Sequence, residues 1–72
     1  MSYKDILISK DFYCWHKCKC GGPLRERWKR KEPHALEFTI WPTKDAIETK
    51  LSKRVVCRTT LGEVENEINK YL

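Results

Sequence analysis

The chain has 72 residues, of which 35% are charged and 40% hydrophobic, and it carries a formal net charge of +5. A chain of this length forms one small domain and cannot hold a two-domain enzyme or a dinucleotide-binding fold. Its composition is that of a folded domain rather than of a disordered tail. Because so small a core is only marginally stable, we expect a further source of stability, such as a metal, disulfides or a partner chain.

The amino-terminal segment contains one short apolar run, Ile6-Leu7-Ile8. A strand is weakly predicted here, with residues 12–16 as the other option. A signal peptide needs about 7–15 apolar residues and a membrane helix about 20, so this run is too short for either. The sequence therefore predicts a cytoplasmic protein without a membrane partner.

Three cysteines and a histidine then fall within seven residues. Thiolate sulfur and imidazole nitrogen are common ligands of zinc, which takes four in a tetrahedral structural site. We therefore expect a Zn²⁺ site. Its predicted ligands are Cys14, Cys18, Cys20 and Cys57, with His16 and His34 as reserve ligands. For this site to form, the strand expected over residues 54–59 has to bring Cys57 beside the other three cysteines.

Two other states of the cysteines stay open. Cysteine is among the residues most often buried, so Cys57 and Cys14 can be core thiols without any metal. If the chain is exported, its four cysteines allow three disulfide pairings. In a reducing compartment, metal ligands and free thiols are the more frequent outcomes.

The segment Cys18-Lys19-Cys20-Gly21-Gly22-Pro23-Leu24 resembles the zinc knuckle of zinc-ribbon proteins, where two cysteines precede Gly-Gly and the start of a strand. In that family two residues usually separate the two cysteines, whereas here Lys19 alone stands between them. The second knuckle of the family is absent, and Cys57 stands alone. The resemblance covers seven residues. It implies a metal site if Cys14 and a distant ligand complete the set, and zinc ribbons often serve in nucleic-acid or protein assemblies.

Residues 17–31 carry seven basic side chains and one acidic side chain, Glu26. A strand is predicted over residues 24–31, because alternate positions divide into a face that can pack and a basic face. The packing face consists of Leu24, Glu26, Trp28 and Arg30, and the basic face of Arg25, Arg27, Lys29 and Lys31.

The basic face suits a phosphate backbone, because side chains on one face of a strand repeat every 6.6–6.8 Å or so. We expect nucleic acid to bind there. The predicted contacts are Arg25, Arg27, Lys29 and Lys31, together with Lys17 and Lys19. Trp15, Trp28 or Trp41, if exposed nearby, would stack on unpaired bases. The alternative is a solvated edge strand whose charges prevent edge-to-edge aggregation.

Three more strands follow, over residues 36–41, 46–51 and 54–59. The first places Leu36, Phe38 and Ile40 on one face, and it should form a hairpin with residues 24–31 through a turn at residues 32–34. The second and third should pair through a short turn at Ser52-Lys53.

A helix ends the chain. Thr60 and Glu63 have the spacing of a capping box, and apolar residues then recur at helical spacing. A lone helix of about twelve residues is marginal in water, so this helix must cover one face of the sheet. The predicted fold class is α+β: a small antiparallel β-sheet of roughly three to five strands with one C-terminal amphipathic helix across one face.

The sequence contains no glycine-rich phosphate loop and no Ser-His-Asp arrangement, and so short a chain offers little enclosed pocket. We therefore predict that the protein is not an enzyme and takes no small-molecule substrate. We expect a small cytoplasmic accessory or regulatory module that contacts nucleic acid and is stabilised by zinc if the cysteines bind it. The alternative is a protein-interaction adaptor with structural cysteines and no nucleic-acid binding.

Overall fold

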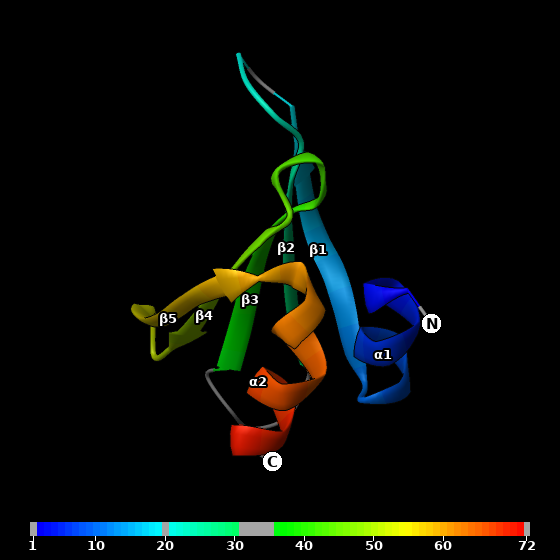
Figure 1. Ribbon diagram of the computed structural model, residues 1–72, viewed down its shortest axis with the longest axis vertical. Coiled ribbons are helices and arrows are strands. Elements are labelled where there is room, and N and C mark those ends of the chain that lie inside the picture. The colour runs from blue at the N-terminus through cyan, green and yellow to red at the C-terminus, as the bar shows by residue number, and fades with distance from the viewer. Residues whose placement is uncertain (1, 20, 31–35, 72) are drawn as a thin grey trace.

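The computed structural model describes residues 2–19, 21–30 and 36–71. In chain order the elements are α1 (Tyr3–Ser9), β1 (Phe12–Cys18), β2 (Arg25–Arg30), β3 (Leu36–Trp41), η1 (Pro42–Lys44), β4 (Ala46–Leu51), β5 (Arg54–Thr60), η2 (Leu61–Glu63) and α2 (Val64–Tyr71), where η marks a single 3₁₀ turn. The strands form one antiparallel sheet in the order β1-β2-β3-β4-β5 (Figure 1). The predicted α+β fold is confirmed.

The two faces of the sheet differ in what covers them. Both helices pack on the face that holds Glu26 and Trp28, which we call the helix face. The opposite face, which we call the open face, holds Arg25, Arg27 and Lys29 of β2. Antiparallel pairing carries this division across the sheet, because directly paired residues point to the same side.

The core lies between the sheet and the helices. Both helices and four of the strands contribute to it, and its buried apolar residues are Leu7, Phe12, Trp28, Leu36, Phe38, Ile40, Ile47, Val64 and Ile68. Full burial of one such large side chain stabilises the fold by about 1.5–3 kcal/mol. The core therefore ties the two ends of the chain to the same face of the sheet.

Helix α1 differs from the sequence-based expectation. The run at residues 6–8 is helical rather than extended, whereas residues 12–16 do lie within a strand, β1. Ser2 caps the helix, since its Oγ accepts a hydrogen bond from the Asp5 amide at 3.4 Å. Leu7 is fully buried and Ile8 is 61% exposed. Burial of Leu7 in the core therefore outweighs the preference of the β-branched residues in this run for an extended backbone.

The C-terminal helix is present, but its predicted capping box does not form. Thr60 occupies the N-cap position with an extended backbone, yet its side chain makes no capping hydrogen bond among the described residues. The first turn is 3₁₀, and the Val64 amide donates to the Leu61 carbonyl. Glu63 instead accepts a hydrogen bond from Asn66 Nδ2 at 2.7 Å.

No helix in the described part of the chain has the length and apolar character that a bilayer crossing needs.

The remaining strands follow the prediction closely. β3 and β4 have the expected bounds, and β5 is one residue longer than expected. Ser52 and Lys53 both have positive φ, at 51° and 70°, as a tight two-residue hairpin turn requires. β2 and β3 pair as an antiparallel hairpin, while its predicted turn at residues 32–34 lies outside the described residues.

Candidate functional site

The basic side of β2 faces away from the helices. Arg25, Arg27 and Lys29 alternate along the strand and are each half-buried among neighbouring side chains, while Glu26 and Trp28 between them are buried on the helix face. This is the division of faces that the alternation in the sequence predicts. The fourth predicted member of the basic face, residue 31, lies outside the described residues.

Side chains on the open face shield one another from water. Thr39, which pairs with Arg27, is only 2% exposed although no described helix covers it. The Nε–H groups of Arg25 and Arg27 are shielded from water and have no acceptor within the described part of the chain. A shielded donor without an acceptor costs about 1–3 kcal/mol. Packing of the side chains on this face therefore shields the Nε–H groups of both arginines.

A β-bulge in β1 places an aromatic ring next to these cations. Cys14 pairs with Trp28 and His16 pairs with Arg27, so Trp15 is the extra residue of the bulge. Its ring lies 5.5 Å from Arg27 Cζ and 5.0 Å from Lys29 Nζ. These are cation–π distances, and they show that Trp15 lies on the open face.

The three tryptophans have different surroundings. Trp15 is 40% exposed, Trp28 is 5% exposed in the core, and Trp41 is half-buried. Tyr13 is 41% exposed and pairs with Lys29, so a second aromatic ring lies on the open face of β1. The alternation of the sequence does not single out Trp15, because a bulge breaks the two-residue period on which that reasoning depends.

Acidic residues of the open face come from strands further along the sheet. Glu37 of β3 pairs with Lys29, and Glu48 of β4 pairs with Arg58 of β5. The Glu48 carboxylate also forms an ion pair with Arg58, at 2.8 Å between Oε2 and Nε. On the open face β2 therefore carries three basic side chains and no acidic one, and Glu37 of the neighbouring strand borders them.

The two other predicted nucleic-acid contacts lie elsewhere. Lys17 pairs with Glu26 and so belongs to the helix face, where its Nζ is 3.8 Å from Glu26 Oε2. Lys19 is exposed just beyond the end of β1. The structure therefore separates Lys17 from the basic face of β2.

The described cysteines are spread over the sheet. Cys14 pairs with Trp28 on the helix face, and its Sγ donates to the His16 carbonyl at 3.4 Å. Cys18 pairs with Arg25 on the open face, in β1. Cys57 lies in β5, at the opposite edge of the five-stranded sheet.

The order of the strands does not bring Cys57 next to Cys18 of the predicted zinc knuckle. Neighbouring strands lie about 4.8 Å apart, whereas a Zn–S bond is about 2.3 Å long. Residues 20 and 34, which supply one predicted ligand and one reserve ligand, lie outside the described residues. Over the described ranges no group of three potential ligands lies close enough to hold a metal. Metal binding at the knuckle stays a prediction.

Cys57 instead belongs to a polar cluster between the sheet and α2. Glu67 of α2 is 3% exposed and accepts a hydrogen bond from Thr49 Oγ1 at 3.2 Å. Lys70 Nζ lies 2.6 Å from the second oxygen of Glu67. A hydrogen bond to Glu67, followed by burial, raises the pKa of the Cys57 thiol. Cys57 therefore takes part in a polar contact between β5 and α2.

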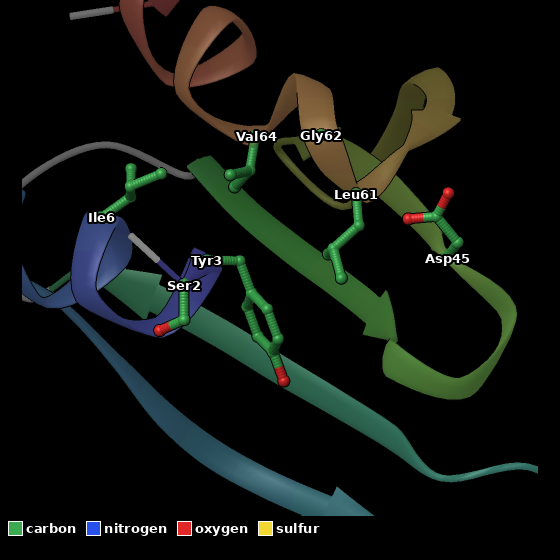
Figure 2. Close-up of a pocket in the computed structure, with 7 residues that line it drawn as sticks. All are labelled: Ser2, Tyr3, Ile6, Asp45, Leu61, Gly62 and Val64. Atoms are coloured by element: carbon green, nitrogen blue, oxygen red, sulfur yellow. The ribbon is translucent and has the colours of Figure 1, made fainter.

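An apolar groove of about 370 Å³ lies on the helix face, between α1 and the start of α2 (Figure 2). Its lining residues are Ser2, Tyr3, Ile6, Asp45, Leu61, Gly62 and Val64. The Tyr3 hydroxyl donates to Glu26 Oε1 at 3.0 Å. Burial, and then this hydrogen bond, raise the pKa of the Tyr3 hydroxyl above its ordinary value. Tyr3 therefore stays protonated and connects α1 to β2.

Comparison of the chain with models of protein families, with curated proteins and with solved structures gives no match. The open face brings together an arginine, a lysine and an exposed indole ring.

Proposed function

We propose that this protein is a small cytoplasmic accessory module that contacts nucleic acid through the open face of β2. Arg25, Arg27 and Lys29 supply the phosphate contacts, and Lys19, which is exposed just beyond the end of β1, is a further candidate contact. The observation that carries the proposal is the position of Arg27 and Lys29 beside the exposed Trp15 ring on the open face. Phosphate oxygens are the acceptors that a guanidinium fork fits best.

The number of basic residues indicates the strength of such binding. Each neutralised phosphate releases a condensed counterion, so the logarithm of affinity falls with the logarithm of salt by about 0.9 per phosphate on duplex DNA and about 0.7 on single strands. With a few phosphate contacts, a dissociation constant on the order of 10⁻⁴–10⁻⁶ M is expected. The interaction should therefore be moderate in strength and strongly dependent on salt.

The test is a fluorescence anisotropy titration with labelled DNA and RNA at about 50 and about 200 mM salt. The double variant Arg27→Gln/Lys29→Gln should bind more weakly, and its salt slope should be smaller by about one for each lost phosphate contact. The matched control is Lys4→Gln/Lys10→Gln, which removes the same charge from exposed positions in and just after α1. Equal loss in both double variants would show that net charge alone drives binding and would overturn the proposal.

A second candidate function is a protein-interaction adaptor. Val55 and Val56 of the edge strand β5 are 41% and 47% exposed, and with Cys57 and Arg58 they line a shallow hollow of about 350 Å³. An edge strand can accept a partner's strand through its free backbone groups. If the protein binds neither DNA nor RNA at low salt, and Val56→Lys abolishes capture of a partner by the otherwise unchanged protein, the adaptor function takes precedence.

A further inference from the structure

We infer that the open face takes single-stranded rather than duplex nucleic acid, with the Trp15 ring as the platform on which an unpaired base stacks. The inference rests on the proposed function and names the substrate class of the same face. Three observations carry it: the exposure of the ring, the position of the cations around it, and the second aromatic ring on the same strand.

Trp15 is more exposed than the other two tryptophans. Its side chain is 40% exposed on the open face, whereas Trp28 is 5% exposed and donates its indole N–H to Glu26. Single exposed apolar side chains are common on protein surfaces, so the informative feature is an exposed indole that lies beside two cations. The face of a nucleobase matches it in size and in apolar character.

The cations around Trp15 complete the site. Arg27 Cζ and Lys29 Nζ lie 5.5 Å and 5.0 Å from the ring centroid. Both cations lie over the ring, so a base that stacks there takes their place, and the displaced cations can pair with its phosphates. Proteins that bind single strands without sequence preference combine these two elements, a positively charged track and stacking aromatic side chains.

Tyr13 extends the platform along β1. It is 41% exposed and pairs with Lys29, so its ring shares the open face with Trp15. Two rings on one strand can receive two bases of the same extended strand. In a duplex the faces of the internal bases are covered by their neighbours, and neither ring would have a partner to stack on.

The experiment uses the full chain and labelled oligonucleotides of about 12 nucleotides, a length within the range that single-strand sites occupy. The probes are oligo-dT, oligo-rU and a DNA duplex of equal length, titrated at low salt. At least one single strand should bind more tightly than the duplex. Its binding should quench tryptophan fluorescence, because the exposed indole stacks on a base.

Variants at Trp15 separate stacking from charge. Trp15→Ala should weaken single-strand binding by about 5- to 150-fold, the range that corresponds to the loss of one stacked base. Trp15→Phe should retain part of that affinity, since an aromatic face remains. The matched control is Val56→Ala, which removes an exposed apolar side chain from the opposite edge of the sheet and should leave binding unchanged.

The outcomes distinguish base stacking on Trp15 from phosphate contacts of Arg27 and Lys29. If single strand and duplex bind equally and Trp15→Ala changes neither, stacking is overturned while the charge-based function stands. If Arg27→Gln/Lys29→Gln has no effect but Trp15→Ala does, the proposed phosphate contacts fail and the stacking site stands. If the wild-type protein binds none of the three probes, both are overturned.

Discussion

Trp28 Nε1 donates a hydrogen bond to Glu26 Oε1 at 3.0 Å, although both side chains lie on the buried face of β2. The same oxygen accepts the Tyr3 hydroxyl at 3.0 Å, and Lys17 Nζ lies 3.8 Å from the other oxygen. A carboxylate that is 1% exposed needs such partners, because burying an unpaired charge is very costly. Glu26 therefore joins α1, β1 and β2 through polar contacts inside the core.

We expect Glu26→Ala to destabilise the protein by about 2–5 kcal/mol. The substitution leaves the Trp28 N–H and the Tyr3 hydroxyl without their acceptor, and each such buried donor costs about 1–3 kcal/mol. Tyr3→Phe, which removes one donor and leaves the Trp28 bond in place, should cost only about 0.5–1.5 kcal/mol. Urea unfolding measures both. A change below about 0.5 kcal/mol in Glu26→Ala would show that the buried carboxylate adds nothing to stability.

The division of β2 into two faces predicts opposite behaviour of neighbouring residues. Trp28→Ala should cost about 3–5 kcal/mol, since it empties a large volume in the core. Arg27→Gln/Lys29→Gln should cost less, about 0.5–1 kcal/mol per site, because each substitution removes a cation–π contact with Trp15 but leaves the core intact. Thermal or urea unfolding of the two variants is the measurement. The reverse order of stabilities would mean that the faces of the strand are exchanged.

The cluster around Glu67 predicts loss of stability in acid. The Lys70 ammonium, ahead of the hydrogen bonds from Cys57 and Thr49, lowers the pKa of the Glu67 carboxyl below its ordinary value of 4.5. As the pH falls, the unfolded chain therefore takes up this proton before the folded protein does. The stabilisation is complete above about pH 4.5 and disappears as the pH falls through the folded-state pKa.

Glu67→Gln isolates this contribution from those of the other carboxyl groups. The variant should melt at a lower temperature than the wild type at pH 7, and the difference should shrink below about pH 4.5. Melting temperatures recorded by circular dichroism from pH 7 to pH 3 provide the comparison. A difference that stays constant over this range would show that ionisation of Glu67 has no part in stability.

The position of Cys57 gives a prediction about metal. Zinc held at the knuckle by Cys18 and its neighbours would stabilise so small a domain, and its removal by a chelator would lower the melting temperature. Because Cys57 lies in β5, across the sheet from Cys18, Cys57→Ser should leave metal content and chelator response as in the wild type. Metal analysis of protein purified under reducing conditions measures this. Loss of bound zinc in Cys57→Ser, with Cys18→Ser as the comparison, would contradict the separation of the two residues.

Local patterns in the sequence determined most of the sheet. The alternation of Leu36, Phe38 and Ile40 defines β3, and the alternation along β2 assigns Trp28 to the core and Arg27 to the open face. These assignments hold because the period of two is a property of the strand itself and does not depend on which strands are its neighbours.

The tertiary structure alone decided the features that depend on pairing and packing. The bulge that places Trp15 beside Lys29 arises from the register of β1 against β2, which no single-strand pattern contains. The helical state of residues 3–9 follows from burial of Leu7 against distant residues. The order of strands separates Cys57 from Cys18. Residues far apart in the chain meet only when the sheet is assembled, so the platform, the buried carboxylate and the spacing of the cysteines are properties of the assembled fold.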